Sequence, residues 1–237
     1  MTPISPTKTV ALYGGSFNPP HEGHLSMASY VQKTLAVDET WMLFSQNPFK
    51  DAVVYPDVKH RINMATILAK NYDANLVMTD IEDEIAAETG HHETFFILNG
   101  LQQRFPTTKF VFVMGADSFA RFHTWKERDD ILNGYIVAVV DRPGYHDEAV
   151  NCRTAVEFAD QAIDITDPDN LKNATHGWCY LNNPTIDMSS SGIIRQLAEG
   201  KTDFQGPFAE VADYIYEHGL YGTAVRICPT LAIGAMI

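Results

Sequence analysis

The chain has few cysteines, little positive charge and no apolar run long enough to span a bilayer. Its 3 cysteines, Cys152, Cys179 and Cys228, are odd in number and far apart, which fits neither a disulfide framework nor a zinc site. The net charge of −13 argues against a broad surface for nucleic acid or for an anionic membrane. We therefore expect a reducing, cytoplasmic location, and any anionic ligand must be held by a local group of residues.

We expect neither a signal peptide in residues 1–8 nor a membrane span in residues 223–237. Residues 1–8 lack the apolar segment of a signal peptide. Residues 223–237 are apolar, but they contain Arg226 and Pro229 and are too few to cross a bilayer. We expect this tail to pack on the protein or to contact a second copy in a homo-oligomer; a disordered tail is the alternative.

The remaining composition is typical of a folded enzyme-sized domain. Hydrophobic residues make up 45% and charged residues 20% of the 237 positions, enough to bury a sizeable core. No glycine-serine linker or internal repeat divides the chain, so we predict one domain over residues 1–237. Residues 145–176 are acidic and weakly periodic, which predicts a surface insertion. Their aspartates lack the spacing of a calcium loop, and we predict no metal ligands from the protein.

Apolar runs alternate with helical patterns along the chain, as in sheets built from βαβ units. Strands are predicted at residues 9–13, 40–45, 75–79, 109–114, 135–140 and 178–181, helices at 25–35, 57–71 and 93–105, and an acidic loop at 82–84. The predicted fold class is α/β, a Rossmann-like open, mostly parallel sheet with helices on both faces. Ligands of such sheets bind beyond the carboxyl ends of the strands, where Gly115 and Arg142 would lie.

The sequence YGGSFNPPHEGHL at residues 13–25 joins the first predicted strand to the first helix. Its adjacent glycines allow a sharp turn and a close approach to a ligand, and the helix N-terminus favours an anion. Its two histidines, three residues apart, can each donate a hydrogen bond to a phosphate oxygen. Surface histidines and simple turn glycines are the alternative. The predicted phosphate site comprises Gly14, Gly15, Ser16, Phe17, His21 and His24.

A second anion site is predicted at residues 189–195, SSSGIIR. Serines at a helix start can simply cap its N–H groups. Here they are followed by an arginine, so hydroxyls, free N–H groups and a guanidinium can face one anion. Ser190, Ser191 and Arg195 are the candidate residues of this second anion site.

These two runs resemble the signatures of the HxGH nucleotidyltransferase superfamily. The second resembles ISSTxIR, with Gly192 in place of the threonine. In that superfamily this signature contacts the β- and γ-phosphates, so the resemblance implies that Ser190, Ser191 and Arg195 contact the departing pyrophosphate. The departure at Gly192 leaves open which of the serines at 189–191 do so. Between the two runs, FVMGADSF at residues 112–119 and HTW at 123–125 resemble the bacterial nicotinate-nucleotide adenylyltransferases. Further similarity lies in NPFK at 47–50, DRPGY at 141–145 and HGLY at 218–221. The resemblance spans roughly residues 9 to 222.

The resemblance implies transfer of the adenylyl group of ATP to the 5′-phosphate of nicotinate mononucleotide, in NAD biosynthesis. It implies that the two histidines serve the α-phosphate and that Mg²⁺ is held mainly by the ATP phosphates. Further ATP or phosphate contacts are then expected from Lys50, Gly115, Asp117 and Arg142, and acceptor contacts from Arg61, Thr94 and Trp125. Trp125 would stack on the pyridine ring, although a tryptophan is often a core residue.

One departure from the family bears on the acceptor. Relatives often have a Tyr-Thr pair where this chain has Glu93 and Thr94. A carboxylate close to the nicotinate carboxylate would be unfavourable unless Glu93 turns away. Nicotinamide mononucleotide is therefore an alternative acceptor. Two further alternatives are a phosphopantetheine adenylyltransferase and a nucleotide sensor without catalysis. His21 argues against the first, because those enzymes usually have threonine at this position. The predicted leaving-group contacts argue against the second, because a sensor would not need them.

Overall fold

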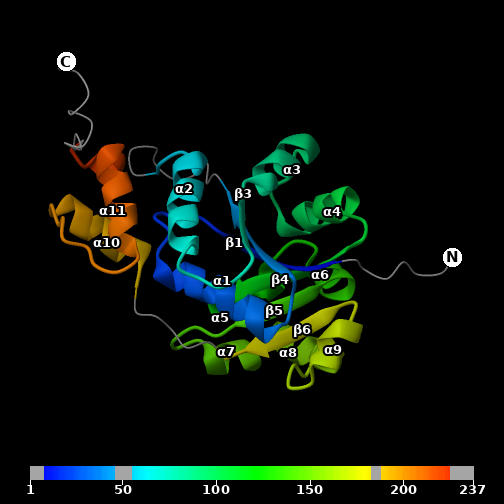
Figure 1. Ribbon diagram of the computed structural model, residues 1–237. Helices are drawn as coiled ribbons and strands as arrows, with labels where there is room; N and C mark the ends of the chain where they lie inside the picture. The colour runs from blue at the N-terminus through cyan, green and yellow to red at the C-terminus, as the bar shows by residue number, and fades with distance from the viewer. Residues whose placement is uncertain (1–7, 46–54, 183–187, 225–237) are drawn as a thin grey trace, which may run out of the picture.

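The computed structural model describes residues 8–45, 55–182 and 188–224. Its centre is a sheet of six parallel strands in the order β3-β2-β1-β4-β5-β6 (Figure 1). The strands are β1 (Lys8–Gly15), β2 (Glu39–Phe44), β3 (Leu76–Thr79), β4 (Thr108–Gly115), β5 (Ile136–Val140) and β6 (Gly177–Leu181). The predicted open parallel sheet is confirmed. Strands β2 and β3 extend the sheet on one side of β1, and β4, β5 and β6 extend it on the other side. The direction of strand addition thus changes between β1 and β4, and ligands of such sheets bind at this switch point.

Helices cover both faces of the sheet, as predicted, because successive residues of each strand point to opposite sides. Val10 and Leu12 of β1 enter one core cluster, whereas Ala11 enters another. The Val10 face is covered by α3 (Ile81–Thr89), α4 (Thr94–Arg104), α5 (Ala116–Phe119), α6 (Arg128–Gly134), α7 (His146–Val150) and α8 (Arg153–Glu157). The other face is covered by α1 (Glu22–Thr34), α2 (Val58–Ala69), α9 (Pro168–Asn173), α10 (Ser190–Ala198) and α11 (Phe208–Glu217).

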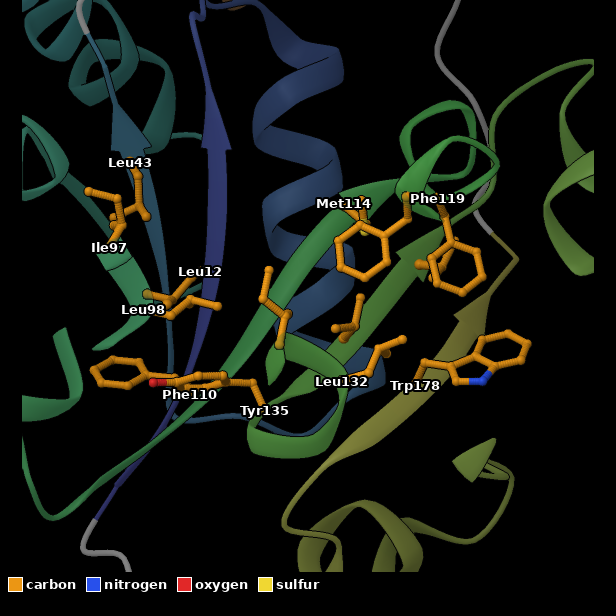
Figure 2. Close-up of a cluster of buried hydrophobic side chains, with 14 of the residues drawn as sticks. Leu12, Leu43, Ile97, Leu98, Phe110, Met114, Phe119, Leu132, Tyr135 and Trp178 are labelled. Carbon is orange, nitrogen blue, oxygen red and sulfur yellow. The ribbon is translucent and has the colours of Figure 1, made fainter. Parts of the chain in front are cut away.

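The larger core cluster fixes α4 and α5 against the sheet (Figure 2). Leu12 of β1 and Ile97 and Leu98 of α4 belong to it, all at most 3% exposed. Phe119 of α5 packs on Trp178 of β6, with ring centroids 5.1 Å apart. This packing holds the start of both helices at the carboxyl edge of the sheet.

Two predicted boundaries are wrong. The predicted acidic loop at residues 82–84 is the first turn of α3. Negative side chains there are favoured by the helix dipole, Ile85 anchors the helix in the core, and Gly90 (φ 73°) ends it. Helix α1 begins at Glu22, three residues before the predicted start, because His21 already occupies the N-cap position.

Residues 145–176 form the crossover between β5 and β6. They contain α7, α8, α9 and the 3-10 helix η3 (Ala159–Gln161). Ala149, Ala155 and Leu171 are buried in the core clusters. The segment therefore contributes to the core, and its description as an insertion stays a prediction.

None of the helices in the described part of the chain has the length and apolarity that a bilayer span requires.

Candidate active site

The signature loop leaves the sheet after β1, which continues through Gly15. The predicted glycine turn is therefore wrong in detail: the residue with left-handed backbone is Phe17 (φ 40°). Phe17 is 3% exposed, and its ring packs against Tyr13 and Phe44 at centroid distances of 5.2 and 4.8 Å. A Cβ on Gly15 would lie 2.8 Å from this ring. Gly15 is thus needed for the close approach of Phe17, because no larger residue leaves room for it.

The two signature histidines lie together at the start of α1. His21 is the N-cap, His24 is in the first turn, and their rings stack with centroids 3.8 Å apart. The backbone N–H of His21 donates to Nδ1 of His24 at 3.3 Å. Because that nitrogen accepts, the proton of a neutral His24 ring is on Nε2, which is then a donor.

Burial keeps both histidines neutral. His21 is 5% exposed, and its Nδ1 has no hydrogen-bond partner within the described residues. Burial lowers the pKa of His21 to about 4. Burial, with the charges of His21 and Arg142 as further causes, holds the pKa of His24 well below its usual value. At neutral pH each ring therefore offers an uncharged N–H group.

The ends of β4 and β5 bring Gly115, Asp117 and Arg142 together. Nε of Arg142 lies 3.1 Å from Oδ1 of Asp117. A Cβ on Gly115 would lie 2.4 Å from that oxygen and 2.6 Å from that nitrogen. Strand β4 pairs with β1, with Tyr13 opposite Val113, so the ends of these two strands lie side by side, and the charge of Arg142 is one cause that lowers the pKa of His24. The structure thus gathers these three predicted residues beside the signature.

The predicted acceptor residues Thr94 and Trp125 occupy neighbouring segments. Thr94 is the first residue of α4, and Trp125 follows the 3-10 helix η2 (Phe122–Thr124). The Trp125 ring is half-buried and packs on Phe122 at a centroid distance of 5.1 Å. Nζ of Lys126 lies 2.5 Å from Oε1 of Glu93, which joins the residue after Trp125 to the residue before Thr94.

This salt bridge explains how the chain accommodates Glu93. The hydrogen bond from Lys126 is the largest cause that lowers the pKa of Glu93, to about 2. His91 lies on the other carboxylate oxygen, with its Nδ1 3.4 Å away. Glu93 is thus an ionised, paired carboxylate that faces Lys126.

The serines of the second motif are divided among three environments. Ser189 caps α10 by accepting from the N–H of Gly192 at 3.1 Å. Ser190 donates its hydroxyl proton to the carbonyl of Pro19 at 2.9 Å, so this serine fastens α10 to the signature loop. Ser191 is exposed, and its hydroxyl donates to Oγ of Ser189 at 3.5 Å. To contact a phosphate, Ser191 would give up this long hydrogen bond, whereas Ser190 would have to release the carbonyl of Pro19.

Arg195 does not share a cavity with the histidines in the described structure. It is exposed on α10 and lines a cavity of about 500 Å³ with Ser189, Gly192 and Glu22. Lys201 also lines this cavity, and neither His21 nor His24 does. The predicted contact between Arg195 and a departing pyrophosphate stays a prediction, and it would have to be made from this side of α10.

Two predicted residues remain, Lys50 and Arg61. Lys50 lies outside the described residues. Arg61 is 0% exposed, and it donates to backbone carbonyls. Burial behind the signature loop therefore corrects the prediction that Arg61 contacts the acceptor directly.

Sequence comparison identifies the family. The cytidylyltransferase-like family model matches residues 12–196. A relative from Methylorubrum extorquens (strain PA1), designated "probable nicotinate-nucleotide adenylyltransferase", is 38% identical over 186 residues, covering 78% of this chain and 97% of its own. The chain belongs to the nicotinate-nucleotide adenylyltransferase family. A Mesorhizobium japonicum relative of the same designation is 33% identical over 196 residues, with 81% and 96% covered.

Structures of this family have the same fold. The Plasmodium falciparum nicotinic acid mononucleotide adenylyltransferase complexed with NaAD aligns with a TM-score of 0.62 at 18% identity, covering 92% of this chain and 100% of that chain. The same enzyme complexed with APC aligns with a TM-score of 0.60. At this identity the likeness concerns the fold alone.

The structure of this adenylyltransferase family member adds two residues that the sequence did not assign to the site. Oε2 of Glu82 lies 3.9 Å from where a Cβ on Gly14 would be, and burial, with the charge of Asp83, raises the pKa of Glu82 to about 7. The hydroxyl of Tyr221 donates to Oδ1 of Asn18 at 2.7 Å and so supports the signature loop. The prediction of a loop at residues 82–84 left Glu82 out of the site. Tyr221 lies in HGLY at 218–221, which resembles the family, but that similarity did not indicate its contact with Asn18.

Proposed function

We propose that the protein transfers the adenylyl group of ATP to the 5′-phosphate of nicotinate mononucleotide and releases pyrophosphate. The observation that carries the proposal is the pair of stacked, neutral histidines at the N-terminus of α1. They lie after the end of β1, at the switch point of a parallel sheet, where an anion meets both N–H donors and the helix dipole.

The reaction requires positioning more than proton transfer. An oxygen of the acceptor phosphate forms a bond with the α-phosphorus of ATP, and the bond from that phosphorus to the bridging oxygen of pyrophosphate breaks. A phosphate dianion is already a nucleophile, so no general base is needed. The two histidines would donate hydrogen bonds to oxygens of the α-phosphate as their charge increases.

The remaining predicted residues would hold the ends of the two substrates. Arg142 places a guanidinium near the histidines, and its contact with Asp117 fixes its direction. The N-terminus of α10, with Ser191, offers N–H groups and a hydroxyl to the departing pyrophosphate.

Magnesium is expected as the cofactor because it neutralises the charge of the triphosphate. Among the described residues, no three His, Cys, Asp or Glu side chains gather as a candidate ligand group. Its ligands would therefore be mainly the ATP phosphates and water.

The salt bridge between Glu93 and Lys126 supports the acid acceptor. It turns the Glu93 carboxylate toward a cation beside Trp125, which reduces its repulsion of a nicotinate carboxylate. A neutral amide would not need this pairing. Nicotinamide mononucleotide stays the alternative substrate, because the two acceptors differ by one group on the ring.

The test is pyrophosphate release from ATP with Mg²⁺, measured with nicotinate mononucleotide and with nicotinamide mononucleotide. We expect a higher kcat/KM with the acid. A higher value with the amide would contradict the acceptor assignment but keep the chemistry. ATP binding without pyrophosphate release, with either acceptor, would contradict the catalytic proposal and favour a nucleotide sensor.

We propose ATP and nicotinate mononucleotide as small-molecule partners, a cytoplasmic location, and no nucleic-acid or membrane contact. The net charge of −13 supports the last of these proposals. A homo-oligomer is compatible with all of them.

A further inference from the structure

Arg61 ties three separate segments of the chain together behind the signature loop. It lies on α2, and its Nη1 donates to the carbonyl of Ser16 at 2.6 Å. Its Nη2 donates to the carbonyl of Ser45, just after β2, at 3.1 Å, and its Nε to that of Pro56 at 3.2 Å. One planar guanidinium thus fixes the loop after β1, the end of β2 and the approach to α2 in a single geometry.

Within the described part of the chain, the buried charge of Arg61 has no salt-bridge partner. The residue is 0% exposed, and among the described residues its polar partners are the three backbone carbonyls. The ring of Tyr55 covers the guanidinium, with 4.4 Å from Cζ to the ring centroid. Burial lowers the pKa of Arg61, and the groups that oppose this effect are Tyr55, Tyr221, Asp83 and Asp57. A buried cation without a paired carboxylate is costly for stability, which suggests that the charge has a use.

The contact with Ser16 also determines the direction of the next N–H group. In a trans peptide unit the carbonyl and the following N–H point in opposite directions. Because Arg61 holds the carbonyl of Ser16 toward itself, the N–H of Phe17 points away from Arg61. Phe17 has left-handed backbone (φ 40°), a conformation that a non-glycine residue keeps only when its surroundings enforce it.

We propose that Arg61 is a positioning residue for the triphosphate. It holds the Ser16 carbonyl inward so that the Phe17 N–H faces the phosphates, and its buried charge adds positive potential beneath them. The proposal rests on the proposed function, because it assigns the polyphosphate of ATP to the space beside the signature loop.

The first test compares Arg61→Lys and Arg61→Met with Lys59→Met, which removes an exposed cation from the same helix. For Arg61→Met we expect kcat/KM for ATP to fall about 10- to 100-fold, through both KM and kcat. Arg61→Lys should recover part of the ATP affinity because it keeps the charge, but little of kcat because it loses the planar fork. Lys59→Met should match the wild type. A folded Arg61→Met protein with wild-type kinetics would overturn the proposal.

A second measurement needs no variant and covers the case in which both Arg61 variants fail to fold. The wild-type protein, labelled with ¹⁵N-phenylalanine, is titrated with Mg²⁺ and a non-hydrolysable ATP analogue. We expect the Phe17 amide to shift strongly, whereas that of Phe105, which lies between α4 and the start of β4 at the amino edge of the sheet, should shift little. An unchanged Phe17 amide at saturation would overturn the proposal. Because this readout is binding alone, it is independent of whether pyrophosphate is released.

Discussion

At the scale of single residues, the proposed mechanism depends on uncharged hydrogen-bond donors in a buried position. His24 uses Nδ1 to accept from the backbone of His21, which leaves its Nε2 proton for a ligand. This internal hydrogen bond sets the tautomer before any substrate binds. The site is therefore preorganised by the same helix start that attracts the anion.

We predict that His24→Ala reduces kcat about 100- to 1,000-fold, the loss typical of one donor to transition-state charge. The variant should remain folded, because the substitution shortens a side chain that is not fully buried. Steady-state pyrophosphate release and circular dichroism check both parts. The control is His92→Ala, which truncates an exposed histidine. Near-normal turnover of folded His24→Ala would remove His24 from the mechanism.

Glu82 gives a prediction about pH and stability. Its pKa of about 7 lies above the ordinary value of 4.5, so the folded state binds more protons than the unfolded state between these values. The stability that Glu82 contributes is full below pH 4.5 and is lost as the pH rises through 7. Glu82→Gln should therefore gain stability relative to the wild type over this range, by on the order of 1 to 3 kcal/mol.

Urea denaturation at pH 4.5, 6 and 8 measures this difference. His21 and His24 have lowered pKa values and give the opposite slope, but they do so in both proteins and cancel in the comparison. Glu199→Gln, at an exposed position, is the control and should follow the wild type. A constant difference between Glu82→Gln and the wild type across the three pH values would contradict the buried, protonated state of Glu82.

At the scale of elements, the last strand depends on one glycine. Gly177 begins β6 with φ 111°, and a Cβ there would lie 2.4 Å from the carbonyl oxygen of Gln161. A backbone oxygen has little freedom to move, and L-residues rarely adopt this φ. We predict that Gly177→Ala lowers the free energy of unfolding by about 2 kcal/mol or more.

Gly134→Ala is the matched control, because Gly134 lies at the end of α6 and a Cβ there meets nothing within 4 Å. It should leave stability unchanged or raise it slightly. Urea midpoints of the two variants make the comparison. Equal midpoints would mean that β6 adjusts its start without cost.

At the scale of the whole molecule, the central strands contribute side chains to the hydrophobic core on both faces of the sheet. Residues of β1, β4 and β5 enter clusters on both faces of the sheet, so neither face can lose its helices without exposing strand residues of the other. We predict one cooperative unfolding transition in urea. Fluorescence reports Trp41, Trp125 and Trp178, which all pack on the same cluster, whereas far-ultraviolet circular dichroism reports the whole chain. Coincident curves are expected, and two separate midpoints would contradict a single domain.

The sequence by itself determined the parallel sheet and six strand positions, and it located the two runs that are proposed to bind anions. Each of these depends on residues that are close along the chain: apolar periodicity, and glycines, histidines or serines at a helix start. Local pattern failed at α3, where three acidic residues indicated a loop but occupy the first turn of a helix anchored by Ile85.

Tertiary structure decided what those residues contact. Arg61 meets Ser16 across 45 positions, Ser190 meets Pro19 across 171, and Tyr221 meets Asn18 across 203. Such pairs leave no local signal, because either partner alone is compatible with an exposed position. Only the packing of α2, α10 and the end of the chain around the signature loop showed that Arg61 and Ser190 hold this loop in place, since burial and hydrogen-bond direction are properties of the folded molecule.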